Sequence, residues 1–362
     1  MTGPALRVLV VDDSVTIRRL VSQGLDEQAG IEVVGTASNG RLALMKVPLL
    51  RPDVILMDVD MPEMNGLEAV TELRRQGDQT PVLMFSALTQ SGAKVALDAL
   101  ARGANDCLAK PSGGLDKAMA QLRDEVAPAL RALGGAGTSL QPAPRGSLKP
   151  TRRPPSKGPA PRVDALLIGS STGGPNALGE LLPKLPGDLG VPVLLTQHMP
   201  PVFTGILAER LDARSSLSVA EAQDGDALRP GHVLVAPGDF HLELRGDAAT
   251  ARARLSQAPK ENSCRPAVDV MFRSAVACFG PHVLGVVLTG MGRDGARGAE
   301  AIVEAGGRVV TQDQASSVVY GMPRHVAEAG LSDGVHPLDE LAEVIRRRVR
   351  KGRSQAQHGR VA

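Results

Sequence analysis

Short apolar runs recur along this chain, and each is followed by a stretch with the composition of a helix. In the first part of the sequence these runs cover residues 6–11, 32–37, 54–57, 82–86 and 106–109. Five short β-runs that alternate with helices favour a doubly wound α/β fold with a parallel sheet. We therefore predict a flavodoxin-like domain with a five-stranded parallel sheet at the N-terminus.

A second α/β pattern follows later in the chain. Its expected strands cover residues 165–168, 191–196, 232–236, 283–289 and 307–311. This pattern again predicts a doubly wound, mainly parallel sheet. Two further runs, 241–244 and 251–255, indicate an added hairpin.

A segment rich in proline and basic residues separates the two patterns. Residues 134–162 contain no acidic residue and too few apolar ones to bury a core. We interpret the segment as an extended linker, and prefer a solvated spacer over a contact site for an acidic partner. The expected domains are therefore 1–133 and 163–350, with the linker at 134–162 and a basic tail at 351–362.

Composition limits the classes of function. The formal net charge is +2 over 362 residues, which argues against a nucleic-acid partner. The three cysteines form no C-x-x-C pair, as expected for a reducing cytoplasm. The chain enters its first strand without a signal peptide, and no apolar run approaches the ~20 residues that span a bilayer. We expect a cytoplasmic protein without membrane insertion.

Charged and hydroxyl side chains follow the expected strands of the first domain. Asp12 and Asp13 follow the first strand, Asp58 the third, Ser86 the fourth and Lys110 the fifth. The carboxyl ends of parallel strands share one edge of a sheet, so these side chains should converge. Crowded carboxylates suit Mg²⁺, which would also neutralise a phosphoryl group arriving at Asp58. Lys110 and Ser86 could hold the phosphoryl oxygens, whereas the simpler alternative is an acidic surface loop.

This arrangement resembles the response-regulator receiver domain. The resemblance covers about residues 6–133 and includes the motifs at 10–14, 56–66, 86–87 and 109–111. It implies that Asp58 accepts phosphate from a sensor histidine kinase. It also implies that Asp13, Asp58 and the backbone carbonyl of Asp60 bind Mg²⁺, with Asp12 in support. One position departs from the family, because Cys107 stands where an aromatic residue usually precedes the lysine by three.

The second domain opens with a glycine-rich turn. Residues 169–173 read Gly-Ser-Ser-Thr-Gly between an expected strand and a helix at 175–182, which fits the G-x-S-x-G turn of serine hydrolases. Such turns also bind phosphate or only reverse the chain. The glycine spacing does not suit a dinucleotide site, and there is no Walker lysine. The next strand ends at His198 rather than at a carboxylate, which favours Ser171 as a nucleophile.

A nucleophilic serine requires a base and a residue that orients the base. His198 follows the strand at 191–196, and Asp294 lies in the glycine-rich loop after the strand at 283–289. Both positions fall at the edge expected for Ser171, whereas His232 and His241 are less well placed. The order Ser, His, Asp differs from that of the α/β-hydrolases and argues against that superfamily.

At these residues the second domain resembles the catalytic domain of the chemotaxis protein-glutamate methylesterases, the CheB family. The matching motifs lie at 168–175, 196–200, 236–241, 288–295 and 321–323, and the receiver, linker and hydrolase order is also that of the family. The resemblance implies that Ser171 is the nucleophile, His198 the general base and Asp294 the orienting residue. We add the N–H of Thr172 as an expected oxyanion donor.

The resemblance further implies a substrate and a mode of control. The family hydrolyses γ-carboxyl methyl esters of glutamates on methylated chemoreceptors, and some members deamidate receptor glutamines. The esterase reaction needs no cofactor, and phosphorylation of the receiver activates it. Two alternatives remain open: a non-catalytic response regulator that only binds receptors, and a DNA-binding response regulator. The second fits poorly because no basic recognition helix is evident.

Overall fold

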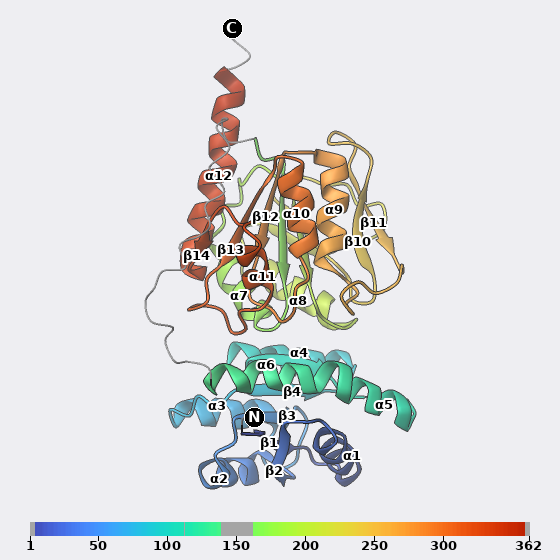
Figure 1. Ribbon diagram of the computed structural model, residues 1–362, viewed down its shortest axis with the longest axis vertical. Coiled ribbons are helices and arrows are strands. Elements are labelled where there is room, and N and C mark those ends of the chain that lie inside the picture. The colour runs from blue at the N-terminus through green and yellow to red at the C-terminus, as the bar shows by residue number, and fades with distance from the viewer. Residues whose placement is uncertain (1–3, 112, 139–161, 359–362) are drawn as a thin grey trace. The chain divides into compact units, whose positions relative to one another are not determined.

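The computed structural model describes residues 4–111, 113–138 and 162–358. The chain forms two compact units, which divide between residues 144 and 145 (Figure 1). Most of the predicted linker, residues 139–161, lies outside the described residues. The two units are considered one at a time.

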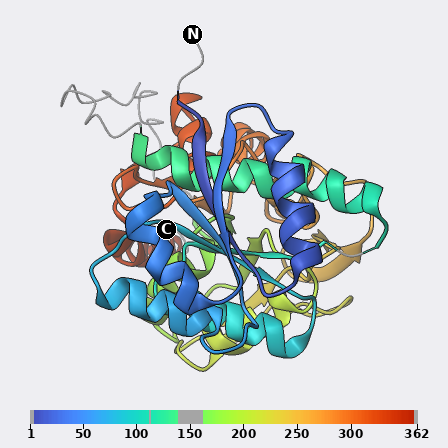
Figure 2. The same cartoon turned by 90° about the horizontal axis from the view of Figure 1, so that it is seen from below.

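The first unit is a five-stranded parallel sheet in the order β2-β1-β3-β4-β5, as predicted. Its strands are β1 (Leu6–Val11), β2 (Ile31–Ala37), β3 (Val54–Asp58), β4 (Val82–Ser86) and β5 (Asp106–Ala109). The inner strands are apolar and buried on both faces, because helices cover the sheet from both sides (Figure 2). The polar ends of β1 and β3 therefore lie together at the carboxyl edge of the sheet.

The helices of this unit follow the strands in alternation. They are α1 (Val15–Asp26), α2 (Gly40–Leu50), α3 (Gly66–Arg75), α4 (Gln90–Ala101), α5 (Leu115–Gln121), the π-helical turn η1 (Leu122–Val126) and α6 (Ala127–Thr138). Side-chain caps from Ser14, Asn39, Asn65 and Thr89 begin α1 to α4. Helix α6 continues to Thr138, five residues beyond the predicted end of the domain at 133.

The second unit is built on a seven-stranded sheet in the order β14-β13-β12-β6-β7-β9-β8. The strands are β6 (Ala165–Ser170), β7 (Val193–Gln197), β8 (Ser218–Glu221), β9 (His232–Val235), β12 (Val283–Val287), β13 (Arg308–Gln312) and β14 (Val335–His336). All neighbours in this sheet are parallel. The predicted parallel fold is therefore confirmed, while β8 and β14 at the two edges were not predicted.

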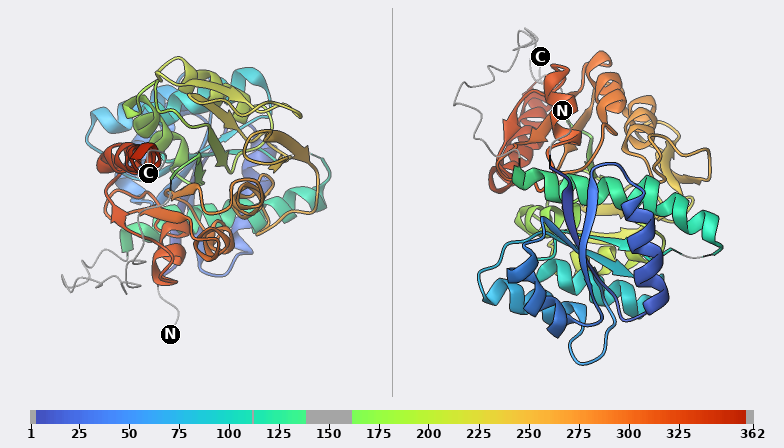
Figure 3. Two further views of the ribbon diagram at one scale, coloured as in Figure 1. Left: turned by 90° about the horizontal axis from the view of Figure 1, so that it is seen from above. Right: turned by 60° about the horizontal axis from the view of Figure 1, so that its bottom comes forward.

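The helices of this unit are α7 (Gly174–Leu181), the 3₁₀ turn η2 (Leu182–Lys184), α8 (Phe203–Asp212), α9 (Val268–Phe279), α10 (Ala296–Glu304), α11 (Met322–Glu328) and α12 (Leu338–His358). Helices α9 and α10 lie side by side (Figure 3), and α9 packs on the antiparallel hairpin of β10 (His241–Arg245) and β11 (Arg252–Ser256). Within the described ranges, no helix combines the length and the apolar character needed to cross a membrane.

The order of the strands places a topological switch point beside β6. From β6 the chain builds outward through β7 and β9, and it later returns to the other side of β6 with β12. Ligand sites of open α/β sheets form at such points, outside the carboxyl ends of the strands. The register aligns these ends, because Gly169 pairs with Val287 on one side and with Thr196 on the other.

Candidate active site and acidic cluster

Ser171 is the first residue after β6, in the turn that leads to α7. Its N–H donates to the carbonyl of Thr289 at 3.0 Å, and its own carbonyl accepts from Gly174 N–H at 2.7 Å. Gly173 has a φ of 77°, a left-handed conformation that glycine adopts without strain. A Cβ atom at Gly290 would lie only 2.8 Å from Ser171 Cβ. Glycine at that position therefore lets the loop after β12 approach the serine.

Thr172 occupies the same turn and is buried. Its carbonyl accepts a hydrogen bond from the Thr289 hydroxyl at 2.9 Å. Within the part of the chain that the structure describes, no acceptor bonds the Thr172 N–H. Helix α7 begins two residues later, so this N–H belongs to the group of amides at the start of a helix, where negative charge is favoured.

His198 and Asp294 come together at the same edge of the sheet. His198 follows β7, its N–H donates to Ser170 O at 3.1 Å, and its Nε2 lies 2.7 Å from Asp294 Oδ2. Its Nδ1 lies 3.5 Å from the sulfur of Cys264. Among the described residues, the Ser171 hydroxyl makes no hydrogen bond to His198. The structure thus pairs base and orienting residue and leaves the serine on the neighbouring strand end.

Backbone amides at the start of α9 hold the Asp294 carboxylate. Val268 N–H donates to Oδ2 at 2.6 Å, and Asp269 N–H donates to Oδ1 at 3.0 Å. Burial alone would raise the pKa of Asp294, but the hydrogen bond and charge of His198 and these amides lower it. Asp294 is therefore held as an anion beside the imidazole.

The contact with Asp294 also changes the pKa of His198, which it raises. Burial alone would lower the pKa of the imidazole, but the neighbouring Cys264 and the hydrogen bond that the imidazole donates to Asp294 raise it well above 6.5. The protonated form is thus the one that the surroundings stabilise. A base that takes up a proton during a reaction benefits from this arrangement, because its product state is favoured.

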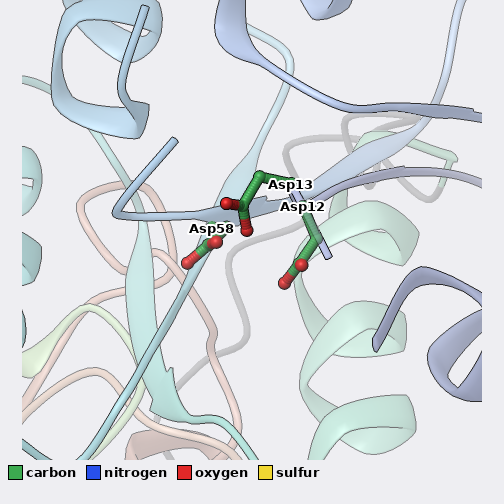
Figure 4. A group of neighbouring side chains, drawn as sticks. All are labelled: Asp12, Asp13 and Asp58. Atoms are coloured by element: carbon green, nitrogen blue, oxygen red, sulfur yellow. The ribbon is translucent and has the colours of Figure 1, made fainter. Parts of the chain in front are cut away.

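Three carboxylates gather at the carboxyl ends of β1 and β3 in the first unit (Figure 4). Asp12, Asp13 and Asp58 each offer an oxygen within 4.8 Å of the others. Lys110 Nζ lies 2.7 Å from Asp12 Oδ2 and 2.7 Å from Asp58 Oδ2. The predicted convergence of these residues is therefore present.

Asp58 is buried, and this burial raises its pKa from 3.8 to about 6. The hydrogen bond and the charge of Lys110 lower the pKa of Asp58, whereas the negative charge of Asp12 raises it further. The exposed Asp60 donates its N–H to Asp58 Oδ1 at 3.4 Å. Ser86 is buried at the end of β4, where its hydroxyl donates to Ala87 O at 3.2 Å.

Both halves of this chain are similar in sequence to known protein families. Residues 166–345 match the CheB methylesterase family, and residues 8–122 match the response regulator receiver domain. A "protein-glutamate methylesterase/protein-glutamine glutaminase" of Nocardioides sp. is 52% identical over 360 residues, which cover 97% of each chain. The chain belongs to the CheB methylesterase family. A relative of the same name from Trichodesmium erythraeum is 46% identical over 96% of this chain and 99% of its own.

Family membership is also visible in the fold. The catalytic domain of the Thermotoga maritima CheB methylesterase is similar to 51% of this chain, with 42% identity, a TM-score of 0.50 and 98% of that domain covered. The seven-stranded sheet described above is thus a methylesterase domain, and the five-stranded sheet is a receiver domain.

Three residues of the CheB-type site were missed by the sequence analysis. Asn262, Cys264 and Asp269 contact His198 or Asp294 but lie in no strand-end motif. The only local signal for Asn262 and Cys264 is the polar stretch Glu261–Cys264 just before Arg265-Pro266, and Asp269 lies beyond it in α9. His241, which the sequence placed less favourably, is buried and uses both ring nitrogens on backbone groups of Pro259 and Ala267.

Proposed function

We propose that this chain is a cytoplasmic, phosphorylation-activated protein-glutamate methylesterase that demethylates chemoreceptors and also deamidates their glutamines. Both activities appear in the names of the curated relatives. The observation that carries the proposal is the 2.7 Å contact of His198 with Asp294 at the strand edge where Ser171 begins its turn. A protein that only binds receptors has no use for this pair.

In the first half of the proposed reaction, Ser171 Oγ attacks the carbonyl carbon of the methyl ester. His198 takes the serine proton on Nδ1, because its Nε2 is occupied by Asp294. Asp294 stabilises the resulting imidazolium, which then protonates the departing methoxide. Methanol leaves, and the glutamyl group remains on Ser171 as an ester.

In the second half, water attacks the acyl-enzyme and His198 again accepts and returns the proton. The Thr172 N–H, which lacks an acceptor in the described structure, would bind the oxyanion in both halves. A glutamine side chain would enter the same path and release ammonia instead of methanol. Both reactions end at the free glutamate carboxylate.

Methanol release from membranes that carry methylated receptors tests this proposal. Ser171→Ala is expected to lower the rate by at least about 10³-fold, and Asp294→Asn by a smaller factor. Ser170→Ala is the matched control, because this neighbouring serine donates to Gln197 and is not the expected nucleophile. Release by Ser171→Ala at the wild-type rate would overturn Ser171 as the nucleophile, whereas no release by the wild type would support the non-catalytic alternative.

We further propose that Asp58 accepts a phosphoryl group from a sensor histidine kinase. The acidic cluster fits Mg²⁺, because its oxygen donors lie within 4.8 Å of one another and Lys110 neutralises only part of their charge. Asp13, Asp58 and the Asp60 carbonyl would hold the ion, with Asp12 in support. Bound Mg²⁺ would neutralise the carboxylates and the phosphoryl oxygens.

The chain's own residues complete this phosphoacceptor site. Lys110 reaches both Asp12 and Asp58 and would move to the phosphoryl oxygens, together with the Ser86 hydroxyl. The domain limits that go with this function are 1–133 for the receiver, 134–162 for the linker, 163–350 for the methylesterase domain and 351–362 for the tail.

A further inference from the structure

A tight turn packs against the His198–Asp294 pair. Glu261 and Cys264 exchange backbone hydrogen bonds of 3.1 and 2.9 Å, and both residues between them have positive φ, 51° at Asn262 and 64° at Ser263. Two positive φ values in a two-residue turn are characteristic of the type I′ geometry, where asparagine is favoured at the first position. The backbone conformation of this turn therefore favours asparagine at position 262.

Helix α9 anchors this turn. The Glu261 carboxylate accepts two hydrogen bonds from the Arg273 guanidinium, at 2.9 and 2.6 Å. Such a bidentate pair fixes orientation as well as distance. The turn is thus attached to the helix whose first amides hold the Asp294 carboxylate.

Asn262 bridges two buried carboxylates. Its Nδ2 donates to Asp294 Oδ1 and to Asp269 Oδ2, each at 2.9 Å. Asp269 and Asp294 are 1% and 2% exposed, so little water reaches the space between them. An amide nitrogen has two hydrogens, one for each carboxylate, whereas an aspartate here would add a third negative charge.

Among the described residues, Asn262 is the one side chain besides His198 that hydrogen-bonds Asp294. The other donors, from Val268, Asp269 and Gly295, are backbone amides that fix the position of the carboxylate. The side-chain donor from Asn262 also separates Asp294 from the carboxylate of Asp269. Without it, the two like charges would face each other at low solvent exposure.

We propose that the Glu261–Cys264 turn is a positioning element of the hydrolase site, in which Asn262 holds the Asp294 carboxylate in the orientation that His198 requires. The same turn places the Cys264 sulfur 3.5 Å from His198 Nδ1. One four-residue segment therefore contacts both the base and its orienting residue. This inference rests on the proposed esterase function and adds a positioning residue to it.

Two substitutions at one position test this role in the full-length protein. Asn262→Ala removes a charge-assisted hydrogen bond, so kcat for methanol release is expected to fall about tenfold or more while KM changes little. Ser263→Ala is the matched control, because it alters the same turn without removing a contact to His198 or Asp294. Equal thermal unfolding of both variants shows that the fold is retained.

Asn262→Asp supplies a readout that a purely structural role would not move. The base is active when neutral, so the rate should rise with pH as His198 loses its proton. An added carboxylate beside Asp294 is expected to shift the midpoint of that rise upward by about one pH unit. The titratable groups around it are Asp269, Glu261, Arg273 and Cys264, and all four are unchanged in this variant.

The outcomes separate this inference from the function on which it rests. A kcat of Asn262→Ala within twofold of the Ser263→Ala control overturns the positioning role, and so does an Asn262→Asp midpoint equal to that of the wild type. Either result leaves the esterase intact if Ser171→Ala is inactive in the same assay. Full activity of Ser171→Ala removes the proposed serine mechanism, and no methanol release by the wild type removes the proposed function itself.

Discussion

At the scale of single residues, the two ring nitrogens of His198 have different neighbours. Nε2 faces the Asp294 carboxylate at 2.7 Å, so in the proposed reaction the proton of Ser171 would go to Nδ1. Cys264 Sγ occupies the space beside that nitrogen, and the side chain of Cys264 is partly exposed. The nitrogen proposed to accept the proton is thus the one beside the Cys264 thiol.

Alkylation of Cys264 is therefore expected to inhibit methanol release. Iodoacetamide transfers a carboxamidomethyl group to the sulfur and releases iodide, which places new bulk beside His198 Nδ1. The measurement is the residual rate after treatment, together with the modified cysteine identified by mass spectrometry. Cys264→Ala should resist inhibition, whereas Cys278→Ala, which changes the other half-buried cysteine, should remain sensitive. Equal inhibition of the Cys264→Ala variant would contradict this prediction.

The sequence alone identifies those residues of the candidate site that lie just after a strand. Ser171, His198 and Asp294 each follow a parallel strand, so their convergence follows from the alternating pattern alone. Asn262 and Cys264 reach the site through a turn fixed by a distant ion pair to Arg273. No periodicity records such a contact, which is why these residues were missed.

At the scale of secondary-structure elements, the end of α6 is also a feature that the sequence pattern does not predict. The pair Gly134-Gly135 suggests a break, yet the helix continues through it to Thr138. A Cβ atom at Gly134 would lie 2.4 Å from Leu6 Cδ1 and 3.3 Å from Val54 Cβ. Gly134 is therefore a close-packing position against β1 and β3, which local propensity does not reveal. Of the unpredicted edge strands, β14 has only two residues, and β8 buries only one of its four, so neither forms an apolar run.

The two glycines of α6 should respond differently to alanine. Gly135→Ala adds a Cβ with nothing within 4 Å and should stabilise the receiver by about 0.5–1 kcal/mol through helix propensity. Gly134→Ala adds the same methyl group against Leu6 and Val54 and should cost about 1–3 kcal/mol through overpacking. Hydrogen exchange of β1 and β3 in the full-length protein measures both effects. Equal responses at the two positions would show that α6 does not pack on the sheet in this way.

At the scale of the whole molecule, a phosphoacceptor unit and a hydrolase unit share one chain. In the receiver, burial raises the pKa of Asp58 to about 6, and Lys110 is its immediate cationic partner. Cys107 is buried in β5 at the position where the family usually carries an aromatic residue. The residues proposed to accept and hold the phosphoryl group are thus present, whereas the usual aromatic residue is absent at position 107. The question for the intact protein is whether phosphorylation still raises hydrolase activity.

Paired substitutions in the receiver answer this question in the full-length protein. With Mg²⁺ and a small-molecule phosphodonor, the wild type should release methanol faster, and Asp58→Asn should lose that increase. Asp60→Asn is the matched control, because the role proposed for Asp60 in binding Mg²⁺ uses only its backbone carbonyl and its side chain is exposed. Ser171→Ala should remain phosphorylated while releasing no methanol. If Asp58→Asn still responded to the phosphodonor as Asp60→Asn does, Asp58 would not be the acceptor that controls this enzyme.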